Sequence, residues 1–477
     1  MLHRPRTAAA AGLLLLPMLS GIASAAPTAH LVLSVGSGFR ASSLPAGTHV
    51  VSSLRHVGAV EITAPASAVP ALTRTAHVRG VWPDFALHTL SDDAPTTGGV
   101  LAPEAVGDKA GKSKSGKGVG IAVIDTGVSD TSALNRDHGD LVRGPNFSGE
   151  AASARDGFGH GTFMANLVAG GSVDGSTIGI APGAVVTDVK VAAADGSTTL
   201  DKVLKGLNWV ADKGPDAGIQ IVSLSLGADR PTSGYGSDPL TDAADAVQQA
   251  GIVVVTASGN DPNQVTDPGQ DPQVFTIGAA DTSASSPVVA SFSGRGMPAN
   301  MRKPDVVAPG AHILSILPEQ SAIAKANPGA RSGKLWRGSG TSQATAVAAG
   351  AVAIFLSGRS DVSPQDVRAS FGTAARDLSG SGDGYGLLVI PTKLVDGDAN
   401  LTKPGDPASG SSDPSAQSTS WSSTSWSSTS WSSTSWSSTS WSSTSWSSTS
   451  WSSTSWSSTS WSSTSWSSTS WSASSWA

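Results

Sequence analysis

Residues 119–127 read Val119-Gly120-Ile121-Ala122-Val123-Ile124-Asp125-Thr126-Gly127, an apolar run that ends at an acid and a glycine. A short apolar run bounded by a turn signal is typical of a buried β-strand. The acid would then lie at the carboxyl edge of a sheet, where open α/β sheets bind ligands. This stretch therefore predicts an α/β fold with Asp125 at its functional edge.

Further strands and helices alternate after this stretch. Thr198 with Asp201 resembles a capping box before a helical stripe of apolar residues. Ser363-Pro364-Gln365-Asp366 is a second helix start, with proline at the first helical position. Strands separated by helix-length segments predict a mostly parallel sheet covered on both faces. The predicted strands are 119–124, 185–191, 219–226, 252–256 and 274–278.

Two more segments place a reactive residue among small neighbours. His160 lies in Gly159-His160-Gly161-Thr162, and Ser342 precedes an alanine-rich stretch that predicts a buried helix. Taken singly, Asp125 reads as a turn residue, His160 as a surface or core residue, and Ser342 as a helix start. Together they supply the carboxylate, imidazole and hydroxyl that activate a serine for attack on a carbonyl.

These motifs resemble those of the subtilisin-like serine endopeptidases, over residues 115–395. The chain order Asp, His, Ser is that of subtilisin and differs from the orders of esterase-type and chymotrypsin-like enzymes. The segment 303–310, Lys-Pro-Asp-Val-Val-Ala-Pro-Gly, also matches the family. The resemblance implies a subtilisin-like three-layer α/β fold and peptide-bond hydrolysis through an acyl-enzyme. Ser342 would be the nucleophile, His160 the general base and Asp125 the group that orients the imidazole.

The resemblance also implies residues that bind the substrate. Asn260 in Ala257-Ser258-Gly259-Asn260 matches the family's oxyanion donor, although an isolated asparagine there would read as a turn residue. Ser225, Leu226 and Gly227 match a segment that pairs with an extended substrate by strand addition. The chain departs from the common family pattern at Phe163, Asn166 and Gln343, which leaves the three reactive groups intact.

The composition limits the cofactors and partners. The chain has no cysteine, which excludes disulfides, thiolate chemistry and cysteine-based zinc sites. Asp137, Asp140 and Asp156 read as surface acids; structural calcium is typical of the family, but no ligand set can be assigned. We therefore expect no cofactor and assign no metal. The formal net charge of −6 gives no basic footprint for nucleic acid.

The N-terminal region predicts export and a separate small domain. Residues 1–25 combine a basic start, an apolar stretch and a small-residue cleavage site, as in a signal peptide. The alternative, a membrane anchor, needs a longer apolar stretch. Residues 26–95 contain two predicted strands, 30–35 and 57–62, and a short helical piece within 66–75. The resemblance implies a propeptide that blocks the cleft as an intramolecular inhibitor; the alternative is a permanent N-terminal domain.

The remaining chain divides into a catalytic domain, 96–399, and a tail, 400–477. A Gly-, Lys-, Pro- and Ser-rich junction, 94–117, opens the first, and the maturation cut is expected near its start. The tail repeats Trp-Ser-Ser-Thr-Ser from Trp421 to Trp476. A period of five gives no single apolar face on a helix or strand, which predicts a disordered spacer. Alternatives are a tryptophan surface that contacts the cell wall or another surface, and a pentapeptide-type coil, whose interior is tight for indole.

Three functions follow from these features. The first is a secreted, extracellular serine endopeptidase that acts on protein or peptide substrates. The second is a cell-surface or wall-binding protein that uses the tail and keeps the peptidase domain as a scaffold. The third, an esterase-type hydrolase, conflicts with the residue order and with the absence of a Gly-x-Ser-x-Gly motif at Ser342.

Overall fold

The computed structural model describes most of the chain between residues 28 and 397. The described residues are 28–92, 99–106, 115–228, 235–283, 286–296, 302–378 and 382–397, with short segments between 420 and 471. They belong to two compact units, Met1–Ala399 and Asn400–Ala477. The predicted signal peptide, 1–25, lies outside the described residues. No described helix is both long and apolar enough to cross a membrane.

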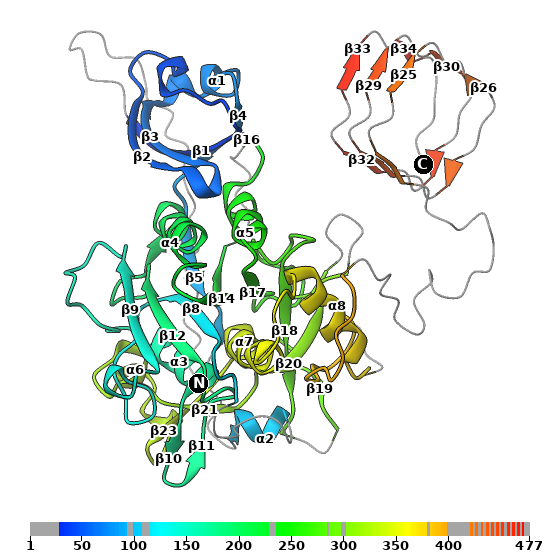
Figure 1. The fold of residues 1–477 in the computed structure, drawn as a ribbon. Coiled ribbons are helices and arrows are strands. Elements are labelled where there is room, and N and C mark those ends of the chain that lie inside the picture. The colour runs from blue at the N-terminus through cyan, green and yellow to red at the C-terminus, as the bar shows by residue number, and fades with distance from the viewer. Residues whose placement is uncertain are drawn as a thin grey trace, which may run out of the picture. The chain divides into compact units, whose positions relative to one another are not determined.

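An eight-stranded sheet forms the centre of the first unit (Figure 1). Its strands follow the order β19-β18-β17-β14-β8-β12-β9, with β20 also paired to β18. Every pairing is parallel except that of β18 with β19, which confirms the predicted mostly parallel sheet. The strands are β8 (Gly120–Asp125), β9 (Leu141–Asn146), β12 (Val185–Lys190), β14 (Ile219–Leu224), β17 (Val253–Ala257), β18 (Phe275–Asp281), β19 (Val288–Val289) and β20 (Val306–Pro309).

All five strands predicted from apolar runs occur in this sheet, but three others were missed. β9 contains Gly144 and Pro145 and has no regular apolar pattern, whereas β19 and β20 are only two and four residues long. Pairing with neighbouring strands stabilises these three strands, and the sequence pattern alone does not reveal that pairing.

Helices cover both faces of the sheet. On one face lie α4 (Leu200–Lys213) and α5 (Pro239–Gln249), and on the other α3 (His160–Ala169) and α7 (Thr341–Leu356). The apolar stripe predicted for α4 is buried against the sheet. All of α3 and nearly all of α7 are buried, and the small side chains of α7 confirm the predicted buried helix.

The two predicted helix starts had different outcomes. The capping box at Thr198 is wrong, because the N-cap of α4 is Thr199 and its side chain makes no capping bond. Instead the backbone N–H of Asp201 donates to the carboxylate of Asp84 at 2.9 Å. The box at Ser363 and Asp366 is confirmed at the start of α8 (Pro364–Ala374). The first prediction failed because the capping group lies 117 residues away in sequence.

The N-terminal region forms a small antiparallel sheet above α4 and α5 (Figure 1). Its order is β16-β4-β1-β3-β2, and a short helix, α1, packs against it. The outermost strand, β16 (Tyr235–Gly236), comes from the region just before α5. The predicted strands and the helical piece are confirmed as β1 (Thr28–Val35), β3 (Ala59–Pro65) and α1 (Val69–Leu72), beside β2 (His49–Leu54) and β4 (Val78–Pro83).

Short strands complete the first unit. A four-stranded path, β22-β23-β21-β7, lies beside α3 and α7, and β6 also pairs with β23. These strands are β6 (Ser91–Asp92), β7 (Val100–Leu101), β21 (Ile313–Ser315), β22 (Arg331–Ser332) and β23 (Leu335–Gly340). Other elements are β5 (Ala86–Thr89), β13 (Thr198–Thr199), β15 (Leu226–Gly227), α2 (Ala102–Val106) and α6 (Ala322–Ala326), with the hairpin β10 (Ser172–Val173) and β11 (Ser176–Thr177).

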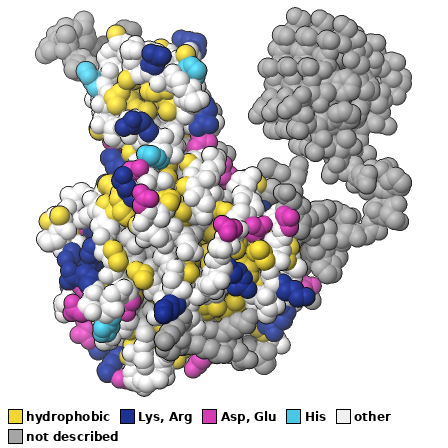
Figure 2. All heavy atoms as spheres, viewed as in Figure 1, with side chains coloured by type: hydrophobic (Ala, Val, Ile, Leu, Met, Phe, Trp, Pro, Cys, Tyr) yellow, Lys and Arg dark blue, Asp and Glu magenta, His cyan; other side chains and the backbone are white. Residues whose placement is uncertain are grey.

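Charged side chains of both signs are interspersed over the described surface that Figure 2 draws. This mixed pattern agrees with the small formal net charge of −6. It differs from the single-sign field with which nucleic-acid-binding proteins attract phosphate.

In the second unit the described residues form parallel ladders with a step of 20 residues. β24 (Ser420–Ser422) pairs with β28 (Ser440–Ser442), which pairs with β32 (Ser460–Ser462), and the other tail strands repeat this relation. Trp421 therefore pairs with Trp441. This register is that of the coil alternative with four pentapeptides per turn; disorder of 400–477 as a whole stays a prediction.

Candidate active site

Asp125 and His160 form a buried hydrogen-bonded pair at the carboxyl end of β8. Asp125 is the last residue of β8, and His160 is the first residue of α3. The imidazole Nδ1 lies 2.8 Å from Oδ1 and 2.9 Å from Oδ2 of the carboxylate. Because a carboxylate only accepts, this contact places a proton on Nδ1. Nε2 is buried and has no hydrogen-bond partner among the described residues, so it is free to accept a proton.

Ser342 lies at the N-terminus of α7, which packs against α3. Its hydroxyl donates to the carbonyl oxygen of Ser225 at 2.8 Å and accepts from the backbone N–H of Leu90 at 3.1 Å. The hydroxyl thus points to Ser225 in this structure and makes no recorded hydrogen bond to His160. Asp125 and His160 are therefore hydrogen-bonded to each other, whereas the Ser342 hydroxyl is hydrogen-bonded to Ser225 and Leu90.

Two N–H groups converge on the carbonyl oxygen of Leu90. The backbone N–H of Ser342 donates to it at 3.1 Å, and the side-chain Nδ2 of Asn260 donates at 2.7 Å. The other end of the Asn260 amide is fixed, because Oδ1 accepts from the backbone N and the hydroxyl of Thr341 at 2.9 and 2.8 Å. A pair of positioned donors on one carbonyl oxygen is the arrangement that stabilises an oxyanion.

The segment that carries Leu90 pairs with strands on both sides. β5, just before it, is antiparallel to β13 and β15, and β6, just after it, is antiparallel to β23. The backbone N–H of Leu90 also donates to the carbonyl of Ser225 at 3.4 Å. Ser225, Leu226 and Gly227, which were predicted to bind substrate, thus lie along this segment.

Comparison with known proteins identifies the family to which this chain belongs. The family model described as the subtilase family matches residues 116–387. The chain belongs to the subtilase family. It is similar to serine protease AprX of Bacillus subtilis, at 35% identity over 62% of this chain and 69% of the relative. It is also similar to subtilisin BL of Lederbergia lenta, at 32% identity over 58% of this chain and 90% of the relative.

A solved structure shares the fold of this subtilase. Fervidolysin from Fervidobacterium pennivorans, a keratinolytic enzyme related to subtilisin, superposes with a TM-score of 0.60 at 22% identity. The match covers 77% of this chain and 62% of the fervidolysin chain. The predicted subtilisin-like fold is confirmed. The subtilase is a serine-type endopeptidase, and proteins or peptides are its substrates.

Asp156 connects the end of β8 to the start of α3, and the prediction that it is a surface acid is wrong. Its side chain is buried, with Oδ1 accepting from the Thr126 hydroxyl at 2.8 Å and from Gly159 N at 2.6 Å. Oδ2 accepts from Thr162 N at 2.7 Å, and the Thr126 hydroxyl accepts from Gly161 N. These bonds tie the residue after Asp125 to the helix start that carries His160.

Burial and hydrogen bonding act in opposite directions on Asp156. Burial raises the pKa of its carboxyl, and the hydrogen bonds from Thr162, Gly159 and Thr126 oppose that rise. Gly159 adopts a φ of 107°, and a Cβ there would collide with Ser321. A glycine at this position is therefore required for the turn into α3. The spacing of Asp156 before His160 was visible in the sequence, but its burial was not.

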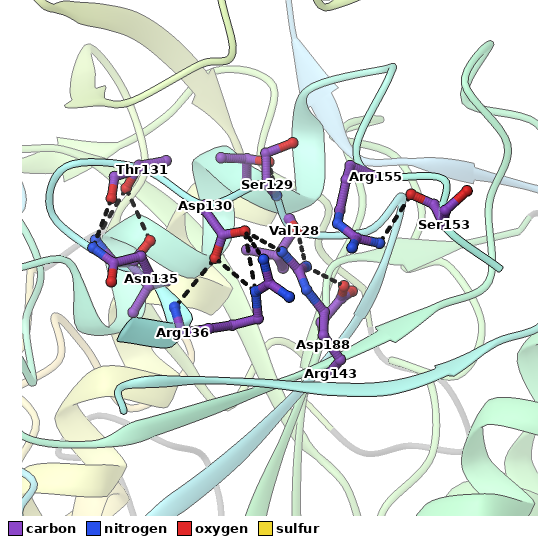
Figure 3. Close-up of polar contacts among 12 residues, drawn as sticks. Val128, Ser129, Asp130, Thr131, Asn135, Arg136, Arg143, Ser153, Arg155 and Asp188 are labelled. Atoms are coloured by element: carbon purple, nitrogen blue, oxygen red, sulfur yellow. Dashed lines mark hydrogen bonds and ion pairs between the residues drawn. The ribbon is translucent and has the colours of Figure 1, made fainter. Parts of the chain in front are cut away.

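A second polar network fixes the loop that leaves Asp125 (Figure 3). Arg143 bridges Asp130 at 3.0 Å and Asp188 at 2.8 Å, and also donates to the carbonyl of Val128. Arg136 donates to the same carboxylate of Asp130. Burial raises the pKa of Asp188, and the hydrogen bond and charge of Arg143 oppose that rise. The loop is thereby held on β9 and β12.

Two buried lysines, Lys190 and Lys303, make further ion pairs and hydrogen bonds in the first unit. Lys190 donates to the carbonyls of Thr126 and Ala192 at 2.5 and 2.8 Å and pairs with Glu150 at 3.0 Å. Lys303 pairs with Asp305 at 2.9 Å. Among the described residues, no group of three or more His, Cys, Asp or Glu side chains could hold a metal ion.

Proposed function

We propose that this subtilase is a secreted endopeptidase whose catalytic triad is Asp125, His160 and Ser342. The buried contact between Asp125 and Nδ1 of His160 supports the first pair, because it orients the ring and leaves Nε2 as the base. The position of Ser342 at a helix N-terminus supports its role, since unpaired N–H groups there stabilise developing negative charge.

The reaction proceeds by acyl transfer. The Ser342 hydroxyl turns from Ser225 toward His160, loses its proton to Nε2 and bonds to the substrate carbonyl carbon. Asn260 Nδ2 and the Ser342 N–H donate to the oxyanion. The departing amine takes the proton from His160 as the peptide bond breaks. Water then attacks the ester, with His160 again accepting the proton, and releases the acid.

A single observation carries this proposal: the carbonyl oxygen of Leu90 accepts hydrogen bonds from both Ser342 N and Asn260 Nδ2. A carbonyl bound in this way has the same surroundings as the carbonyl of a peptide substrate. The orienting bonds from Thr341 to Asn260 support the same role, because they direct Nδ2 toward that oxygen.

The same observation supports an inhibitory role for residues 26–95. β5 fills the groove between β13 and β15, where an extended substrate would pair. We propose that this region is a propeptide that blocks the cleft until it is cut away. The signal-peptide character of residues 1–25 supports export and an extracellular location.

The tail suggests an additional binding role. The 20-residue ladder step sets the tryptophans of successive turns in register, as in Trp421 with Trp441. Tryptophan favours positions that are apolar on one side and wet on the other, so a tail with this repeat would suit a surface such as a cell wall. Removal of residues 400–477 should then abolish sedimentation with cell walls and leave peptidase turnover unchanged. Loss of turnover together with sedimentation would contradict the separation of the two roles.

The proposed chemistry is tested with the full chain and its Ser342→Ala variant. Wild type should hydrolyse a casein or peptide substrate and should react with a phosphonyl fluoride, whereas Ser342→Ala should do neither. Ser339→Ala, three residues earlier, is the control and should react with the fluoride. Labelling of Ser342→Ala to the same extent as wild type would remove Ser342 as the nucleophile.

A further inference from the structure

Residues 86–92, the cleft segment, are held by main-chain pairing on both sides of one peptide bond. Before that bond, β5 pairs Ala86 with Thr199 and Thr89 with Leu226. After it, Ser91 of β6 pairs with Gly340 of β23. The pairing partners therefore change between Leu90 and Ser91. Extended peptide held in register on both sides of a bond is the bound form of a substrate.

The Leu90–Ser91 bond also carries the polarised carbonyl. Leu90 O accepts from Ser342 N and Asn260 Nδ2, and Leu90 N donates to the Ser342 hydroxyl. The nucleophile and both oxyanion donors thus contact the same residue. No other carbonyl of the cleft segment has such contacts recorded among its described residues.

Side-chain burial along the segment is uneven. Leu87 and Leu90 are 3% and 2% exposed, whereas Ala86 and His88 face solvent. Leu87 joins the apolar cluster under α4 that contains Leu200 and Leu226. Two leucines, at the first and fourth positions before the bond, thus make the buried side-chain contacts of this strand.

We infer that the Leu90–Ser91 bond is the bond that this subtilase cuts in itself, and that the buried side chains of Leu87 and Leu90 hold this bond in place for the cut. The inference rests on the proposed function. The predicted cut near residue 95 lies outside the described residues, and the inferred bond is a few residues earlier.

The cut is a hydrolysis with no further reactant than water. Ser342 Oγ bonds to the carbonyl carbon of Leu90 as the Leu90–Ser91 bond breaks. The Ser342 proton passes through His160 Nε2 to the Ser91 nitrogen, which becomes a free amine. Water then releases Leu90 as a carboxylate and restores the Ser342 hydroxyl. Because the segment already lies in the cleft of its own chain, the rate should not change with protein concentration.

The bond is tested by intact mass and N-terminal sequencing of the full chain during maturation. The wild-type product should begin at Ser91, at a rate constant over a 50-fold dilution. A product that begins at another residue would overturn the inference. If that product still cleaves peptides, the proposed function survives; if wild type neither matures nor cleaves peptides, the proposed function fails as well.

The role of the Leu90 side chain is tested with matched variants. Leu90→Asp should slow maturation at least about 100-fold, because a charge would be buried where Leu90 is 2% exposed. His88→Asp makes the same change in charge on an exposed side chain and should alter the rate less than about threefold. Leu90→Met, which keeps volume and apolar character, should also stay within about threefold. Equal slowing by Leu90→Asp and His88→Asp would overturn the role of the Leu90 side chain in the cut.

A second measurement does not depend on folding of the variants. Matured wild type is given the peptide Ala-Leu-His-Thr-Leu-Ser-Asp and versions with aspartate at each leucine or at the histidine. We expect kcat/KM to fall at least about 30-fold for either leucine change and less than about threefold for the histidine change. A uniform response at all three positions would contradict the inference.

Discussion

The helices on the two faces of the central sheet differ in how completely they are buried. On the α3/α7 face, both helices are buried almost throughout, and their N-termini carry His160 and Ser342. On the α4/α5 face, the helices are amphipathic, and their outer sides meet the N-terminal sheet. The first face is covered by helices buried within the central domain, and the second also packs against the N-terminal sheet.

The contacts across the second face are both apolar and polar, because Val32, Leu54 and Trp82 join the buried apolar cluster of α4 and α5. Lys205 on α4 pairs with Glu61 at 3.1 Å, and Asp242 on α5 pairs with Arg79 at 3.0 Å. Such pairs give specificity of docking but little net stability when they are exposed. The comparison teaches that the α3/α7 face holds the candidate site on helices buried in the central domain, whereas the α4/α5 face packs on the N-terminal sheet through apolar contacts and ion pairs.

On the catalytic face, the largest effect is expected from Asn260→Ala. Loss of Nδ2 removes one of two oxyanion donors, so kcat should fall about 10²- to 10³-fold with KM little changed. Steady-state kinetics on a peptide substrate would check this. Asn263→Ala, an exposed asparagine of the same loop, is the control. A rise in KM that accounts for the whole loss would exclude the oxyanion role.

The next largest effect is expected from Asp156→Asn, which tests how much the buried hydrogen bonds of Asp156 stabilise the fold. An amide NH₂ would replace one carboxylate oxygen that now accepts from N–H or O–H donors. We expect the free energy of unfolding to fall by about 2–3 kcal/mol. Urea unfolding in the Ser342→Ala background, which cannot digest itself, would measure it. Asp137→Asn, on an exposed residue, should change little, and equal losses would contradict the buried role of Asp156.

A smaller effect is expected where the N-terminal sheet meets α4. Asp84→Ala removes the acceptor for Asp201 N, and loss of a helix cap costs about 1 kcal/mol. Amide exchange in the first turn of α4 should then rise about fivefold in the Ser342→Ala chain. Asp216→Ala, in the exposed loop after α4, is the control. Unchanged exchange would mean that water replaces the cap without cost.

The smallest effect concerns Asp245 on α5. Burial, with the nearby carboxylates of Asp271 and Asp242, raises the pKa of Asp245 to about 6. The native chain therefore binds this proton more tightly than the unfolded chain, and its contribution to stability is lost as pH rises through about 6. Asp245→Asn should add about 1 kcal/mol at pH 8, after allowance for solvent screening of this half-exposed group, and much less at pH 4. Urea unfolding at both pH values checks this, and an equal gain at both would refute the charge mechanism.

Local sequence patterns predicted the features that depend on residues close together in the sequence. The apolar runs gave the strands of the central sheet, and the Asp125 and His160 motifs met at its carboxyl edge as expected. The alanine-rich run after Ser342 gave a buried helix because small side chains let α7 pack closely against the sheet.

Contacts between distant segments could not be predicted in the same way. Asp84 caps α4, and Leu90 contacts Ser342 across 252 residues of sequence. Asp156 read as a surface acid because carboxylates are seldom buried, and only the donors gathered around it explain its place. The direction of the Ser342 hydroxyl likewise depends on Leu90 and Ser225, which no local motif specifies.

The anchoring of β7 and α2 has a consequence for the inferred cut at Leu90–Ser91. β7 pairs with β21, and Ala102 of α2 is fully buried, so the chain is fastened about ten residues beyond Leu90. If the chain is cut at Leu90–Ser91 as inferred, the amine freed at Ser91 stays attached to this anchored segment, which raises its effective concentration near the ester. Religation then competes with hydrolysis in self-processing, whereas the leaving amine of a foreign substrate escapes into bulk solvent.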